Sequence, residues 1–382
     1  MLLFLTLIMT AYFKSAEIVS LLIFELIGIL AINIYYYTRN SSNEYLNIIN
    51  LIKCADTINK MNITPINERY INLKSSITSL KSLKRKVTND CLGSTDLRNL
   101  YLKMIRIIDM SELIDNEEIH YVISNHNKEF EYLYNFVGEI DAFISVGFFR
   151  NSLDYYCIPT FSDSINIDAE DLYHPLLKNS VSNSINIDSS ILITGCNASG
   201  KSTFLRSIGI NLILSQTINT ACASNLKITF FRLLTSISLK DSIKKGDSYY
   251  IAEIKAIKRM IDSSTLNSPF VFLIDEVLKG TNTIERIAGG SSILNFLSRP
   301  NKLCFAATHD LELCDILKDC YKNYNFDGYI NNNDILFDYK IKPGMSERKN
   351  AIILLKKFEY ENKILEDAKK RIDNFIKLKS WK

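Results

Sequence analysis

Two glycines, a lysine and a serine form the part of this chain best suited to chemistry. Residues 191–209 read ILITGCNASGKSTFLRSIG. The match to G-x-x-x-x-G-K-[ST] is formed by Gly195, Gly200, Lys201 and Ser202. Such glycines let backbone N–H groups curl around a phosphate, the lysine reaches the β- and γ-phosphates, and the hydroxyl binds Mg²⁺. The stretch predicts a site for ATP and Mg²⁺.

An acidic pair follows an apolar run downstream of this loop. SPFVFLIDE at 268–276 predicts a buried strand that ends in Asp275 and Glu276. We expect Asp275 to hold Mg²⁺ through water and Glu276 to orient the attacking water. A third run, KLCFAATHD, ends near His309. We expect His309 to sense the γ-phosphate, because α/β sheets place their ligands at the carboxyl ends of strands.

The elements that must position these residues are predicted from a change in pattern along the chain. From 43 to 153 the pattern is helical and almost free of proline and glycine. From 159 to 345, short β-rich runs alternate with helical ones, which is typical of an α/β domain. A charged amphipathic helical tail is predicted for 346–382. We therefore expect an α/β P-loop NTPase domain preceded by an all-helical region.

The first 38 residues are strongly apolar and predict a membrane segment. Residues 18–37 read IVSLLIFELIGILAINIYYY, and a helix of that length spans about 30 Å, one hydrocarbon core. The apolar residues outweigh the single carboxylate of Glu25. A membrane hairpin and a single anchor with a leader both fit residues 1–38. The alternative is a buried helix pair in a soluble domain.

Composition limits the class of partner and the compartment. The 382 residues carry 45 Lys and Arg against 42 Asp and Glu, a net charge of +3, so any basic surface for nucleic acid must be local. Eight cysteines form no C-x-x-C pair, which argues against a zinc site or a disulfide framework. A reducing compartment and ATP chemistry predict that the globular part lies in the cytosol, at the cytoplasmic face of a membrane.

Together the motifs resemble the ATPase domain of the MutS family of DNA mismatch repair proteins. The loop resembles TGPNxxGKSTxxRxxG, and GDSYYIAEI at 246–254 resembles GxSTFxxEM. LIDEVLKGTNT at 273–283 resembles LxDExxxGTST, and ATHDLEL at 307–313 resembles ATHYxEL. With YHPLL upstream and a stretch like YxLxxG downstream, the resemblance covers roughly residues 130–360.

The resemblance implies an ABC-type ATPase fold and a homodimer. Ser248 would contact the γ-phosphate bound by the opposite subunit, and the loop at 280–283 would lie at the same interface. ATP would clamp the two copies together, and its hydrolysis would loosen them. The nucleotide-binding residues implied are Gly195, Asn197, Ala198, Ser199, Gly200, Lys201, Ser202 and Thr203, with Ser248 in trans.

The chain also departs from the family pattern. The aromatic residue that stacks on adenine is missing near Ser180, and Tyr173 is the alternative. Base preference is therefore left open. Other departures are Cys196 for proline, Tyr249 and Tyr250 for Thr-Phe, and Asn282 for serine. Only about 130 residues precede the resemblance, with no Phe-x-Glu element, so mismatch reading in the strict sense is not expected.

Four functions stay open. The first is a membrane-anchored dimeric MutS-like ATPase that acts on DNA or, as an ATP-driven conformational switch, on a protein partner. The second is a soluble DNA-repair ATPase. The third is a transporter subunit, disfavoured because 258–268 reads KRMIDSSTLNS where LSGGQ is expected. The fourth is a structural protein with an inactive loop.

Overall fold

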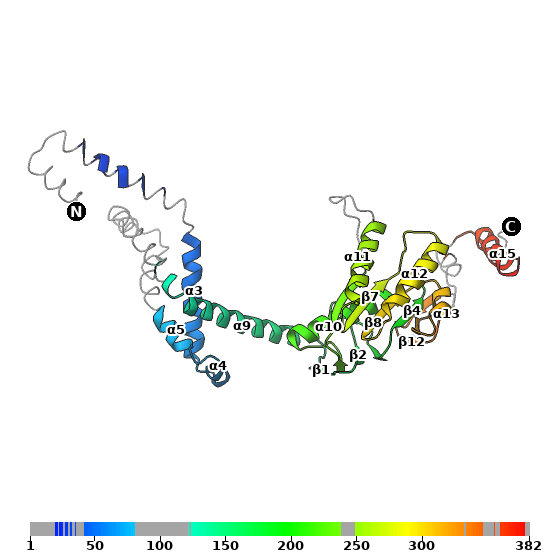
Figure 1. Ribbon diagram of the computed structural model, residues 1–382, viewed down its shortest axis with the longest axis horizontal. Coiled ribbons are helices and arrows are strands. Elements are labelled where there is room, and N and C mark those ends of the chain that lie inside the picture. Colours follow the sequence, from blue (N-terminus) through cyan, green and yellow to red (C-terminus); the bar gives the residue numbers. More distant parts are fainter. Residues whose placement is uncertain are drawn as a thin grey trace, which may run out of the picture. The chain divides into compact units, whose positions relative to one another are not determined.

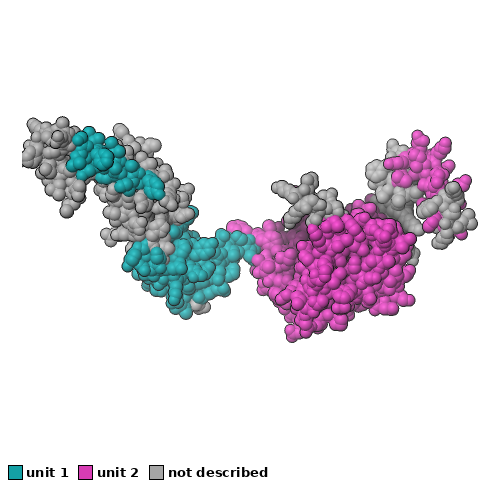
Figure 2. Space-filling model, turned by 45° about the horizontal axis from the view of Figure 1, so that its top comes forward, with its two compact units in different colours: residues 1–147 teal, residues 148–382 magenta. Residues whose placement is uncertain are grey.

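Two compact units make up the chain, residues 1–147 and 148–382 (Figure 2). Figure 1 shows them as a computed structural model. The structure describes residues 42–80, 124–237, 249–331, 334–346 and 360–378, with scattered positions between 20 and 35 and at 121 and 355.

The first unit is helical. The elements described in it are α3 (Ser42–Lys60), α4 (Thr64–Arg69), α5 (Leu73–Ser79) and the first part of α9 (Asn127–Asn151). Apolar residues recur at three- and four-residue spacing, and α3, α5 and α9 each bury the stripe that these residues form. The core that these stripes form consists of Ile49, Ile52, Ala55, Leu73, Ile77, Leu80, Leu133 and Phe136.

A six-stranded sheet organises the second unit. Its order is β12-β9-β4-β8-β7-β6, parallel except for β12. The strands are β12 (Lys342–Pro343), β9 (Lys322–Phe326), β4 (Ile191–Gly195), β8 (Lys302–Ala307), β7 (Phe270–Asp275) and β6 (Arg232–Ser236). The predicted α/β class is confirmed.

The central strands are buried on both faces, which explains their continuous apolar sequence. Successive side chains of β7 alternate between two cores. Val271 and Leu273 pack with α10 (Lys201–Ile218), whereas Phe272 and Ile274 pack with α11 (Tyr249–Ser264) and α12 (Thr283–Leu297). Figure 1 shows α11 and α12 beside β7 and β8. The sheet is thus the middle layer of an α/β sandwich.

Smaller elements complete the unit. A four-stranded sheet of order β1-β5-β2-β3 shares the core on the α10 side. Its strands are β1 (Thr160–Phe161), β5 (Asn225–Ile228), β2 (Ile167–Leu172) and β3 (Asn183–Ile187). The others are the hairpin β10 (Gly328–Asn331) with β11 (Asp334–Phe337), the short α13 (Glu312–Ile316) and the helix α15 (Asn362–Leu378).

The predicted membrane segment is not supported by the described residues. Within the described ranges, no helix combines the length and hydropathy needed to cross a bilayer. Much of the predicted run at 18–37 lies outside those ranges.

We expect Phe272→Ala to lower the free energy of unfolding of this unit by about 3–5 kcal/mol, because the substitution leaves a cavity in the central sheet. Phe272 is fully buried. The matched control is Phe230→Ala, since the Phe230 side chain is 63% exposed. That change should stay within about 1 kcal/mol. Urea unfolding followed by circular dichroism measures both; equal losses would contradict the assignment of β7 to the core.

Candidate active site

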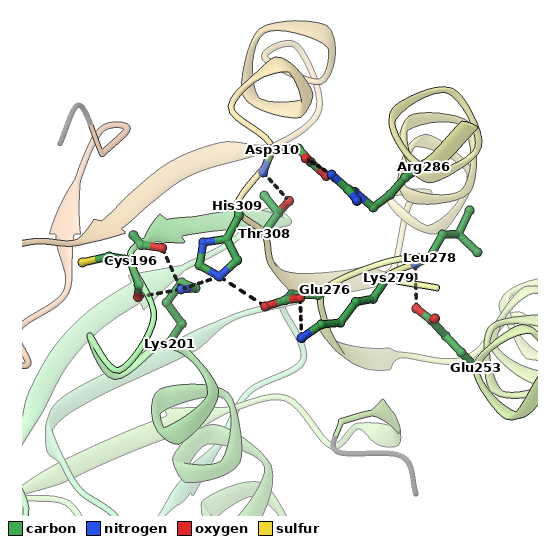
Figure 3. A network of polar contacts seen from close by, with 11 residues as sticks. Cys196, Lys201, Glu253, Glu276, Leu278, Lys279, Arg286, Thr308, His309 and Asp310 are labelled. Atoms are coloured by element: carbon green, nitrogen blue, oxygen red, sulfur yellow. Dashed lines mark hydrogen bonds and ion pairs between the residues drawn. The ribbon is translucent and has the colours of Figure 1, made fainter. Parts of the chain in front are cut away.

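The order of three strands brings the predicted chemical groups together. β8 lies between β4, which leads into the phosphate-binding loop, and β7, which ends in the acidic pair. All three strands are parallel, so their carboxyl ends meet at one edge. His309 follows β8 and therefore lies between Lys201 and Glu276 (Figure 3).

The loop after β4 has the backbone that its glycines predict. Gly195 has φ 139°, Ala198 φ 64° and Gly200 φ 113°. A Cβ on Gly195 would lie 2.4 Å from the carbonyl oxygen of Phe326, so only glycine fits there. Gly200 caps α10 without a side chain. The first-turn N–H groups of α10 thus suit an anionic partner such as a phosphate.

A pocket of about 160 Å³ opens over this loop. Its lining is Asn197, Ala198, Ser199, Gly200, Lys201, Ser202, Thr203, Glu276 and Tyr339. The predicted nucleotide-binding residues from 197 to 203 therefore share one pocket with Glu276. Gly195 lies just before it, at the end of β4.

Lys201 is buried, and its ammonium group contacts the loop itself. Nζ donates to the carbonyl oxygens of Gly195 at 2.7 Å and Cys196 at 2.9 Å, and it lies 3.4 Å from His309 Nε2. Burial lowers the pKa of Lys201, opposed by the charge of Glu276. An ammonium group that is held by weak neutral acceptors in a dehydrated place binds an anionic phosphate oxygen strongly.

The carboxylate of Glu276 is contacted by two side chains, one at each oxygen. His309 Nε2 lies 3.2 Å from Oε1, and Lys279 Nζ lies 2.8 Å from Oε2. The hydrogen bond from His309, assisted by Lys279, lowers the pKa of Glu276 to about 2 against the opposing effect of burial. Glu276 is therefore ionised at neutral pH and can accept a hydrogen bond from water.

A buried carboxylate from α11 holds the backbone behind Glu276. Oε1 of Glu253 accepts a hydrogen bond of 2.6 Å from the N–H of Leu278. Both Glu276 (φ 60°) and Leu278 (φ 55°) have left-handed backbone, which is costly for residues other than glycine. Burial raises the pKa of Glu253. The sequence pattern included Glu253 as a motif residue without giving it this supporting role.

The residues predicted to hold Mg²⁺ fit a hard cation. Ser202 lines the pocket, and Asp275 is the last residue of β7, at the same carboxyl edge. A hydroxyl and a carboxylate oxygen are ligands that Mg²⁺ prefers. Ser199 Oγ is buried in the same loop without a hydrogen-bond partner, which leaves the loop a free polar atom for a ligand.

The aromatic residue of the pocket is Tyr339, which the sequence did not reveal. Its ring lies against Gly200: a Cβ built on that glycine would be 3.3 Å from the ring. The alternative, Tyr173, is wrong, because its side chain is buried and its hydroxyl donates to the carbonyl of Tyr155 at 2.8 Å. Tyr339 has left-handed backbone, φ 53°, which sequence spacing does not predict.

The predicted interface residues are only partly described. Ser248 lies outside the described residues. Asn282, which replaces serine, is the N-cap of α12, and its side chain accepts a hydrogen bond of 3.0 Å from the N–H of Glu285. Serine and asparagine cap helices equally well, so the substitution keeps the start of α12 intact.

Comparisons with known proteins agree with the motifs. A family model described as MutS domain V matches residues 191–376. The chain is 28% identical to MutS protein homolog 4 of Homo sapiens over 362 residues, 82% of this chain and 38% of the human protein. It is 26% identical to DNA mismatch repair protein MutS of Staphylococcus carnosus (strain TM300) over 252 residues, 63% of this chain and 29% of that protein.

A third relative is DNA mismatch repair protein MutS of Clostridium kluyveri (strain ATCC 8527). The identity is 26% over 358 residues, which cover 89% of this chain and 38% of that protein. The chain thus spans less than two-fifths of the length of each of these three relatives.

We expect Tyr339→Ala to weaken nucleotide binding about 5- to 30-fold, because base stacking on an aromatic ring contributes roughly 1–2 kcal/mol. Isothermal titration with ADP measures the effect. Tyr339→Phe keeps the ring and should bind as the unchanged protein does. If Tyr339→Ala binds ADP with unchanged affinity, the ring has no role in the pocket.

Proposed function

This chain carries a MutS domain V and is related to the MutS proteins, and from that premise we propose that it is a dimeric ATPase whose nucleotide cycle acts on DNA. One observation carries the proposal: Lys201, His309 and Glu276 meet at the mouth of a phosphate-binding loop. MutS family members are ATPases, and each of these three groups has a place in phosphoryl transfer.

The residues divide the work of hydrolysis between them. Lys201 would exchange its two carbonyl contacts for phosphate oxygens, which neutralises charge on the β- and γ-phosphates. Glu276, ionised at neutral pH, would hold the attacking water in line with the γ-phosphate. His309 would hold Glu276 through Nε2 and sense the γ-phosphate.

Lys279 occupies one oxygen of Glu276 and so competes with water for that carboxylate. Its ammonium contacts one carboxylate oxygen, at 2.8 Å, and its side chain is 59% exposed. An exposed ion pair of this kind breaks at little cost. Mg²⁺, held by Ser202 and Asp275, would add positive charge beside the phosphates. Within one copy, the freeing of Glu276 for water would therefore need only a small movement of the Lys279 side chain.

The dimer and the DNA substrate follow from the family and are proposals for this chain. MutS family proteins act as dimers on DNA, which supports a composite site with Ser248 of one copy on the γ-phosphate held by the other. Two of the relatives are named DNA mismatch repair proteins. The net charge of +3 means that a DNA-binding surface depends on a local group of basic residues.

We expect Lys201→Ala to abolish ATP binding, because no other buried cation described at this loop replaces the ammonium.

Glu276→Gln should keep ATP affinity and slow hydrolysis by about 10²–10³-fold, since a neutral amide cannot polarise water. Because ATP then persists, this variant should accumulate as a dimer. Calorimetry, phosphate release and light scattering measure the three effects.

The substrate is tested by phosphate release from the full chain with no DNA and with duplex, branched or mismatched DNA. Stimulation by any DNA, lost in Glu276→Gln, supports the proposal. Absence of ATP binding by the unchanged protein would contradict the site, and a monomer in the ATP-bound Glu276→Gln variant would contradict the composite dimer.

A second proposal is a membrane-associated switch in which the same ATPase acts on a protein partner at the cytoplasmic face of a membrane. The observation that favours it is the exposure of helical apolar side chains near the N-terminus. Those described are Leu21, Ile23, Phe24, Ile27 and Ile32. Apolar groups exposed together mark a surface for lipid or protein.

We expect the full chain to pellet with membranes and to resist a carbonate wash if this segment is inserted. Replacing Ile23 and Ile27 by arginine should release it, because each charge costs about 2.5–3.5 kcal/mol within the bilayer. Ile316→Arg, at an exposed position of α13, should stay in the pellet. Recovery of the unchanged chain in the soluble fraction would contradict insertion.

A further inference from the structure

An ion pair next to His309 has no part in the chemistry described so far. Arg286, in the first turn of α12, donates from Nε to Asp310 Oδ2 at 2.7 Å and from Nη2 to Asp310 Oδ1 at 2.6 Å. The guanidinium and the carboxylate therefore meet through two parallel bonds, the geometry that fixes both groups most firmly. Figure 3 shows this pair beside Thr308 and His309.

The pair is sheltered from solvent, unlike most ion pairs of the described residues. The side chains of Arg286 and Asp310 are 25% and 12% exposed. The hydrogen bonds with Asp310 raise the pKa of Arg286 in spite of partial burial. A sheltered pair with two bonds restricts its backbone far more than an exposed contact does.

Asp310 is tied to the backbone that carries His309. The N–H of Asp310 donates to Thr308 Oγ1 at 3.0 Å, and the N–H of Thr308 donates to the carbonyl of Ile193 in β4 at 3.0 Å. Residues on both sides of His309 are thus anchored, one to the sheet and the other to α12. The imidazole has little freedom except rotation about its own side-chain bonds.

One residue of the pair is a departure of this chain from the MutS-like motif. Asp310 stands where the MutS-like motif ATHYxEL has tyrosine. An acid at that position, next to His309 in the chain, would add negative charge to the site if it were left unpaired. Arg286 neutralises it, and its charge also acts on Glu276.

We propose that Arg286 and Asp310 form a positioning pair that holds His309 against Glu276 and couples the start of α12 to the hydrolytic site. The inference rests on the proposed ATPase function. The pair touches no substrate and acts through His309. Since α12 begins at Thr283, the last residue of the loop at 280–283, a movement of that loop reaches His309 through Arg286.

The kinetic test uses the full chain with Arg286→Ala, Asp310→Ala and the exchanged pair Arg286→Asp with Asp310→Arg. Each single variant should lower kcat about 10- to 100-fold. In Asp310→Ala the ATP dissociation constant should change less than about two-fold, because orientation is lost without an added negative charge, whereas Arg286→Ala also leaves the carboxylate of Asp310 unpaired. The exchanged pair should recover at least a third of the lost kcat on a logarithmic scale. Lys322→Ala, which breaks the exposed pair with Asp188 in the same unit, is the control.

A second measurement does not depend on hydrolysis. Carbethoxylation of histidines by diethylpyrocarbonate, read by peptide mass spectrometry, compares His309, whose side chain is 36% exposed, with His126, whose side chain is 38% exposed. Arg286→Ala should raise the rate at His309 several-fold and leave the rate at His126 unchanged.

The two measurements separate the proposals. If the unchanged chain hydrolyses no ATP but His309 becomes more reactive in Arg286→Ala, the positioning pair stands and the proposed function falls. Equal His309 reactivity in both proteins overturns the positioning pair. So does a kcat loss no larger than that of Lys322→Ala, or a loss in nucleotide affinity in Asp310→Ala equal to its loss in kcat.

Discussion

The pairing of β8 between β4 and β7 is the constraint on which the site depends. Backbone hydrogen bonds fix these strands in register, with Ile193 and Asp275 both opposite Ala307. The residues that follow each strand therefore lie at the same edge of the sheet, where their side chains can contact one another. The two cores on either face of the sheet keep this register, because slipping by one residue would exchange every buried side chain.

Local sequence predicted the strands and the loop well, because each depends on a short stretch. The stretch at 191–209 begins with the strand Ile191–Gly195, and the run at 268–276 contains β7. What local sequence could not predict is which strands become neighbours, since pairing depends on contacts far apart in the chain. Tyr339 was missed for that reason, and the Arg286–Asp310 pair joins two elements whose spacing carries no pattern.

In the site, a carboxylate stays ionised beside two hydrogen-bond donors, and a lysine is buried beside backbone carbonyl groups. Glu276 has His309 and Lys279 as partners, and Lys201 has two backbone oxygens. The partners of Glu276 outweigh the usual effect of burial on the pKa of an acid, whereas burial lowers the pKa of Lys201 and the charge of Glu276 opposes that change. A phosphate group that enters the pocket meets a cation with only neutral partners at close range, and it finds an anion already compensated.

The contact between Glu253 and Leu278 has a consequence for how the protein loses activity on warming. The two left-handed residues of the loop each cost on the order of 1 kcal/mol or more, and a single carboxylate from α11 helps to hold that backbone in place. Should α11 loosen, the loop can relax to an ordinary backbone while the sheet beneath stays folded. The protein would then lose activity at a lower temperature than the one at which the unit unfolds. The difference between the two temperatures would measure the stability of the packing of α11.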